Sequence, residues 1–531
     1  MRFFVENYSS KRKKIVLNLL RWAYDKQTIL FEREHENMAI KPQYETYRYT
    51  GEICRLQSQS IVECRLPGSE IGSILAVNAK AVPTECTCVD GEVRYSGKLL
   101  LCVTYEDGNR KICRVERGAE FFHNAKNPSV TPACFAKAAF TAQNITHRRE
   151  GSGLYISVIV DADLCVYGAR QTEYLVGGDG LVTKKKTVTL THTVCVSGET
   201  EGEDEFETQT VGDILLHGES AIVHAVRISA GQLDIEGELC LHMCILQADE
   251  SVCSYERLLP FHMQIPCEET IGALSASARV CVKSASLTAA VDEEKNITKT
   301  ILSYCLSADC FLHTGEELSV VDDVFAPAAH LTCTQENGGG MYVTKVLTCT
   351  QRLGGTAYLS GGFDDGYALQ AAVLPRAEIA CKKTGNAWEA EGAIYAEVLL
   401  KNSESGYKSS SLSLPFAFPL NADGEYVTAD CIVCGLNVRK IGENIEAEAT
   451  VKVALVCYAQ REWGYVLDVK EGEKRKVSTA AMSVFLPCVG EDLWQVAKRL
   501  ACAPEELQKS NPELTFPVKE GERIYVYRQI P

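Results

Sequence analysis

Hydrophobic and polar residues alternate with a period of two over long stretches of this chain. Apolar residues occupy every second position from 156 to 166 and again from 445 to 457, and a matching stretch covers 297–312. Because successive side chains of a β-strand point to opposite faces, this period predicts strands with one buried face. The Gly- and Asp-rich turns between such strands favour β-rich, sandwich-like modules.

The strand pattern recurs in three copies. Each copy has a central glycine that is followed 24 residues later by a phenylalanine. The pairs are Gly97 and Phe121, Gly237 and Phe261, and Gly392 and Phe416. Successive glycines are 140 and 155 residues apart, which indicates repeats of domain size and not the short units of a solenoid.

With 531 residues the chain is too long for one hydrophobic core. We therefore expect a mainly β protein with five parts. They are a basic, amphipathic amino-terminal extension (1–50), three repeated β modules (51–170, 171–332 and 333–475) and a small carboxy-terminal βααβ domain (480–531).

Near the carboxy terminus the spacing of apolar residues changes from every second position to that of a helix, which predicts a first short helix. Apolar residues at 493, 496, 497 and 500 follow the spacing of one helix face. Asp492 stands at the N-cap position with Gln495 three residues later, as in a capping box. This helix is expected to lie between a short strand and a second helix.

The second helix is predicted to begin at Pro504, because proline suits the first helical position. Ala503 stands before it, where a polar cap is usual, and Asn511-Pro512 ends the helix. A last strand is predicted from the alternation of Ile524 and Val526.

This strand–helix–helix–strand order resembles the LysM module. The resemblance is carried by Gly490, Leu493-Trp494, Val496-Ala497, residues 505–507, Asn511-Pro512, Gly521, Ile524 and Val526. Most LysM modules bind N-acetylglucosamine polymers such as peptidoglycan, and some bind proteins. The resemblance implies a binding groove made by Gly490, Glu491, Asp492, Leu493, Asn511, Pro512, Glu513, Leu514 and Thr515. It implies a core made by Trp494, Val496, Ala497, Leu500, Leu507, Ile524 and Val526.

The three β modules resemble the SPOCS domain of endospore-forming bacteria, on the residues 57–63, 70–77 and the strand around Gly97. Three such modules followed by LysM resemble the SipL family, whose members partner the coat-scaffold ATPase of the developing spore. The resemblance implies a spore-coat assembly protein in the mother-cell cytosol, at the forespore surface. The alternative is a peptidoglycan-binding protein of the cell wall or cortex, which would have to be exported.

Charge and motifs exclude several classes of function. The net charge of −16 argues against nucleic acid as a partner, because phosphate binding needs a basic surface. The 24 cysteines are scattered through strand-like runs, and Cys431 and Cys434 form the only C-x-x-C pair. No phosphate-binding, nucleophile or metal motif is present. We therefore expect no catalytic residues, no metal and no cofactor.

No apolar run is long enough for a membrane-spanning helix, which needs about 18 residues. The six-residue run 15–20 follows four basic residues but is too short for the core of a signal peptide, which needs about 7. A basic amphipathic helix is the favoured interpretation, either packed on the first module or in contact with an anionic membrane.

Within the LysM-like groove, Glu491, Asp492 and Glu513 are acidic, and Leu514 and Phe516 are the apolar residues nearby. Sugars are held mainly by directed hydrogen bonds and stacking, whereas an acidic groove with an apolar rim suits a basic protein surface. The groove therefore favours a protein partner over a glycan.

Overall fold

In this computed structural model the chain is described over residues 40–67, 71–151, 153–208, 212–292, 297–358, 363, 366–476 and 480–527. These residues fold mainly into β-strands, as expected, with two short α-helices near the carboxy terminus. The predicted amphipathic helix lies outside the described residues.

Each repeat contributes six long strands in the same order. The first contains β1 (Lys41–Pro67), β2 (Ile71–Val89), β3 (Glu92–Asp107), β4 (Ile112–Lys126), β5 (Phe135–Glu150) and β6 (Gly153–Asp179). The second contains β7 (Val182–Thr208), β8 (Gly212–Ser229), β9 (Gln232–Gln247), β10 (Val252–Pro266), the 3-10 turn η1 (Glu268–Thr270), β11 (Ala273–Asp292) and β12 (Ile297–Phe325). The third contains β13 (Ala329–Tyr358), β14 (Ala368–Thr384), β15 (Ala387–Asn402), β16 (Gly406–Leu420), β17 (Tyr426–Ile441) and β18 (Asn444–Lys474).

The sheet topology is the same in the three repeats. One antiparallel sheet joins the first, sixth and fifth strands, in the orders β1-β6-β5, β7-β12-β11 and β13-β18-β17. The other joins the second, third and fourth strands, in the orders β2-β3-β4, β8-β9-β10 and β14-β15-β16. Each hydrophobic core takes side chains from both sheets, so the two sheets pack face to face.

The predicted alternation is confirmed in these cores. Every second residue from Ile156 to Val166 is at most 2% exposed, and every second residue from Ile445 to Cys457 is at most 3% exposed. The structure also explains the glycine–phenylalanine repeat, because Gly237 pairs with Phe261 across neighbouring strands. A Cβ atom at Gly237 would lie 2.3 Å from Cζ of that ring, so the ring occupies the space that a side chain would need. The other two glycines meet their phenylalanines in the same way.

The repeats are longer than the sequence suggested. β1 begins at Lys41, inside the expected extension, and β6 continues to Asp179, beyond the expected boundary at residue 170. The long strands outrun their third neighbour and continue as three two-stranded ribbons. These ribbons, which we call the stalk, pair residues 41–51 with 168–179, 182–191 with 315–325, and 329–342 with 459–474.

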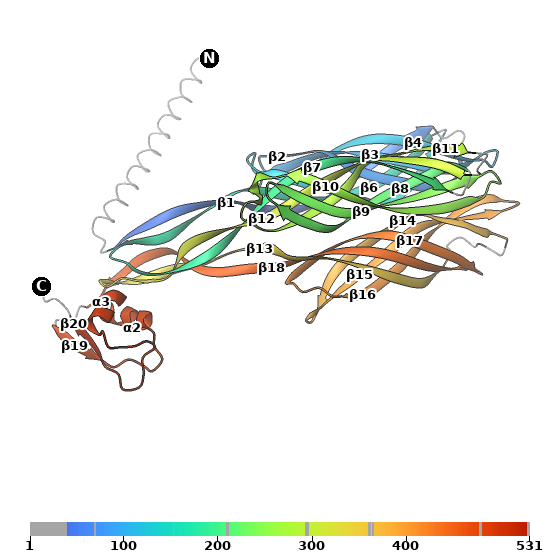
Figure 1. The fold of residues 1–531 in the computed structure, drawn as a ribbon. Helices are drawn as coiled ribbons and strands as arrows, with labels where there is room; N and C mark the ends of the chain where they lie inside the picture. Colours follow the sequence, from blue (N-terminus) through green and yellow to red (C-terminus); the bar gives the residue numbers. More distant parts are fainter. Residues whose placement is uncertain are drawn as a thin grey trace, which may run out of the picture.

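The stalk has its own apolar interior, built from all three repeats. Ile40 and Leu175 of the first repeat lie against Val324 of the second and Val469 of the third, and each is at most 5% exposed. Figure 1 shows the three ribbons converging at one end of the molecule. Each ribbon therefore buries its apolar face against the other two.

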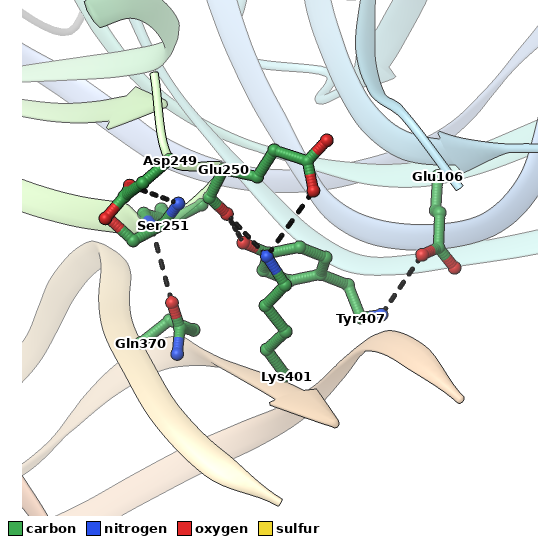
Figure 2. A network of polar contacts seen from close by, with 8 residues as sticks. Glu106, Asp249, Glu250, Ser251, Gln370, Lys401 and Tyr407 are labelled. Carbon is green, nitrogen blue, oxygen red and sulfur yellow. Dashed lines mark hydrogen bonds and ion pairs between the residues drawn. The ribbon is translucent and has the colours of Figure 1, made fainter. Parts of the chain in front are cut away.

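The repeats also meet away from the stalk, where the second sheets bring together the equivalent residues Ile112, Val252 and Tyr407. Figure 2 shows polar contacts at this junction. The backbone N–H of Tyr407 donates to the Glu106 carboxylate at 3.1 Å, and Lys401 Nζ donates to the Glu250 carbonyl at 2.9 Å. Contacts at both places join the three repeats into one body.

Candidate functional site

The carboxy-terminal unit contains β19 (Met482–Phe485), α2 (Leu493–Leu500), α3 (Pro504–Ser510) and β20 (Ile524–Tyr527). β19 and β20 pair antiparallel. The start of α2 confirms the predicted capping box. Asp492 Oδ1 accepts a hydrogen bond from the Gln495 N–H at 2.7 Å, and the Gln495 side chain accepts one from the Asp492 N–H at 3.0 Å. The cap fixes the direction in which α2 leaves the preceding turn.

A small core forms between the helices and the sheet. Val496, Ala497, Leu507, Ile524 and Val526 are at most 4% exposed, and Leu500 packs against them. The second helix begins at Pro504, as predicted. Its N-cap residue is Ala503, whose side chain makes no hydrogen bond to the helix, as expected from the absence of a polar residue there.

Trp494 packs against this small core, as expected, and also reaches beyond the βααβ unit. Its ring packs on Phe325 at the end of β12, with ring centroids 5.2 Å apart, and its Nε1–H donates to Asp323 Oδ2 at 2.8 Å. Lys498, one turn along α2, donates to the same carboxylate at 2.7 and 2.8 Å. Trp494 therefore holds the βααβ unit on the end of the stalk (Figure 1).

Asp323 is the electrostatic centre of this contact. Burial acts to raise the pKa of its carboxyl group, but the hydrogen bonds from Lys498 and Trp494 outweigh burial and hold the pKa below its ordinary value. The carboxylate is therefore favoured in the charged form that both donors require.

Asn511 differs from its predicted place in the groove. It is 7% exposed, and its Nδ2 donates to the carbonyls of Leu507 at 2.9 Å and Tyr525 at 2.8 Å. Its Oδ1 accepts from the Tyr525 N–H at 2.8 Å. The side chain uses both polar atoms to hold the loop after α3 against β20, so it has a structural role.

Leu493 and Pro512 are the two predicted groove residues that the structure brings into one shallow depression. They line it with Pro504, Glu505, Gln508 and Lys509. The contribution of α3 was missed, because the sequence gives no sign of which helix face borders the loops. Glu513 and Thr515 are exposed on the following loop, and Leu514 is half-buried.

The groove is less acidic than its sequence implies. Glu491 is ion-paired with Arg499, and it accepts a hydrogen bond from the Cys488 N–H at 2.8 Å. Asp492 is engaged in the helix cap, and Gly490 forms the turn before it with φ of 90°. Glu513 and Glu505 are exposed carboxylates at this surface.

A second concave region lies between the repeats and was not predicted, because its lining comes from all three of them. This cavity of about 540 Å³ is bordered by Lys80, Glu219, Arg376 and Glu397, among others. Burial raises the pKa of Glu397. Burial also acts to raise the pKa of Glu219, but the hydrogen bond from His217 and the charge of Lys80 hold it below its ordinary value.

Among the described residues, no group of three or more His, Cys, Asp or Glu side chains is arranged to bind a metal ion. The cysteines of this part of the chain are free thiols, including Cys431 and Cys434. Burial raises the pKa of several of them, for example to about 12 for Cys86. In the same described part, neither short helix is long and apolar enough to cross a membrane.

Comparisons of the chain with protein-family models, curated proteins and solved structures found no match.

Proposed function

We propose that this protein is a non-enzymatic assembly protein of the spore coat, similar to SipL, with SPOCS-like repeats and a LysM-like carboxy-terminal domain. In this proposal it acts in the mother-cell cytosol, and its LysM-like domain links the coat-scaffold ATPase to the forespore surface. The observation that carries the proposal is the attachment of the βααβ unit to a three-repeat body through Trp494, Lys498 and Asp323. A fixed attachment suits a connector, because it presents one binding surface in a defined direction.

The surface chemistry of the groove supports a protein partner. Leu493 and Pro512 supply apolar contact area, and Glu505 and Lys509 place one charge of each sign in the lining. Glu513, exposed next to Pro512, adds a negative charge on the adjoining loop. In protein interfaces a few apolar residues provide most of the affinity, and surrounding charges set orientation and association rate. The complementary partner surface would carry an apolar residue surrounded by lysine or arginine.

Binding of peptidoglycan is the competing function. The same depression contains the Gln508 amide beside the apolar ring of Pro512, and carbohydrate sites use such a combination of a polar group and an apolar surface. However, the Gln508 Nε2 already donates to the Leu514 carbonyl at 3.3 Å, which leaves fewer donors for a sugar.

The two functions are separated by one pair of assays on the full chain. We expect tagged protein to retain the coat-scaffold ATPase from sporulating cells, and we expect it to remain in the supernatant when sedimented with purified peptidoglycan. Micromolar binding to peptidoglycan without retention of the ATPase would instead support the wall or cortex function.

A further inference from the structure

The outer face of the β19–β20 sheet is an exposed apolar surface. In the antiparallel register Met482 pairs with Tyr527 and Val484 with Tyr525. These residues, with Leu486 and Val489 just after β19, are 38–68% exposed. We call Met482, Val484, Tyr525 and Tyr527 the outer sheet face. With Leu486 and Val489 they make up six of the 16 exposed large hydrophobic residues in the described part of the chain, although the βααβ unit is a small fraction of it.

The size of this face limits what can cover it. Two paired four-residue strands span only about 13 by 10 Å, which gives a contact on the order of a few hundred Å². A stable association of two separate proteins usually buries about 800 Å² on each partner. A tethered segment can occupy a smaller face, because its effective concentration reaches about the millimolar range. The size therefore favours a segment of the same chain over a second copy.

The first described residue of the chain, Ile40, lies close to this unit. Ile40 is 1% exposed in the stalk interior against Val324 and Ala326, and its N–H donates to the Glu471 carboxylate at 3.3 Å. Phe325, between those two residues, is the one on which Trp494 packs. Fifteen connecting residues can extend about 50 Å, about twice the diameter of so small a domain. Residues before 25 can therefore reach any surface of the βααβ unit.

The sequence of this segment complements the outer sheet face. Val16, Leu19, Leu20 and Ala23 follow the i, i+3, i+4, i+7 spacing of one helix face. Residues 1–39 contain eight Lys and Arg and five Asp and Glu, a net charge of +3, whereas the remaining 46 Lys and Arg and 65 Asp and Glu give −19. Opposite charge favours docking onto the body, and the apolar stripe matches the apolar face.

We propose that residues 11–24 dock as an amphipathic helix on the outer sheet face, with Leu19 and Leu20 against Val484 and Tyr525. This interaction does not depend on the proposed spore-coat function. It covers a surface on the opposite side of the sheet from α2 and α3, so the groove stays accessible.

Site-specific photocross-linking in the full chain tests this docking. A benzoylphenylalanine replaces Val484, and the cross-linked peptides are identified by mass spectrometry after irradiation. We expect cross-links to residues 11–24 of the same chain. Leu19→Asp should lower their yield at least tenfold, while Asn18→Asp, which makes the same charge change on the opposite helix face, should leave the yield unchanged.

Cross-links that join two chains would assign the face to a second copy and overturn the proposal. The absence of cross-links to residues 1–39 would also overturn it. In that case, flotation of the full chain with phosphatidylserine vesicles tests whether residues 11–24 bind a membrane instead. Co-flotation of the wild type with the vesicles, lost in Leu19→Asp, would assign the segment to a membrane surface.

Discussion

Replacement of Asp323 by alanine should release the βααβ unit from the stalk. The carboxylate accepts the Trp494 Nε1–H at 2.8 Å and the Lys498 ammonium at 2.7 and 2.8 Å. A hydrogen bond to a charged group contributes about 1.5–3 kcal/mol. The half-exposed ion pair with Lys498 adds about 0.2–1 kcal/mol. Because one carboxylate serves both contacts, we expect a combined loss of about 2–3 kcal/mol, which corresponds to a change of about 30- to 150-fold in the docking equilibrium.

The assay measures the docking equilibrium in the full chain. Small-angle scattering should report a larger radius of gyration, and a protease should cleave between Lys474 and Met482 faster in proportion to the undocked population. Asp322→Ala is the matched control, because the Asp322 carboxylate pairs with Lys186 of β7 at 2.6 Å. Equal scattering and cleavage rates for the two variants would refute the assigned role of Asp323.

Acid should have the same effect as the substitution. The pKa of Asp323 is held below its ordinary value, so its contribution to docking is complete above the unfolded carboxyl pKa of about 3.9. This contribution is lost as the pH falls through the lower pKa of the docked state. The cleavage rate of the wild type should therefore rise towards that of Asp323→Ala in this acidic range, whereas the variant should show a smaller change.

Three further predictions concern the fold. Gly237→Ala should lower the free energy of unfolding by about 1–3 kcal/mol in denaturant titrations, because its Cβ would overlap the Phe261 ring. The control Gly108→Ala, in an open turn without a positive φ, has no such overlap. Asn511→Ala should raise amide exchange of β20 by removing hydrogen bonds to Tyr525, an effect that Ser510→Ala should not reproduce. Glu106→Ala should lower the midpoint of thermal unfolding by leaving the buried Tyr407 N–H unpaired, and an unchanged midpoint would show that this contact adds nothing to the junction.

Local sequence patterns predicted the strands and helices but not the tertiary contacts between them. The alternation between Ile445 and Cys457, the capping box at Asp492 and the start of α3 at Pro504 depend on residues close in sequence, and the structure has them as expected. The stalk could not be predicted in this way. Its ribbons have apolar faces that resemble those of ordinary strands. Strands from the other two repeats, far away in sequence, bury these faces.

The candidate site shows the same limit. Trp494 has the position and character of a core residue in a small domain, and only the proximity of Phe325 and Asp323, more than 160 residues earlier, turns it towards the stalk. Asn511 is polar and follows a helix, which is also typical of a ligand-facing loop. Its structural role depends on the approach of β20, which no local pattern specifies.

Direct binding of the full chain to the purified coat-scaffold ATPase tests the central proposal most directly. The measurement compares the wild type with Glu513→Lys in the groove loop and Glu520→Lys outside it, two exposed positions with the same charge change. We predict saturable binding of the ATPase, weakened about 3- to 10-fold by Glu513→Lys through slower association and unchanged by Glu520→Lys. Absence of ATPase binding by the wild type, with micromolar binding to peptidoglycan that Glu513→Lys alters, would contradict the proposal and assign the groove to a glycan.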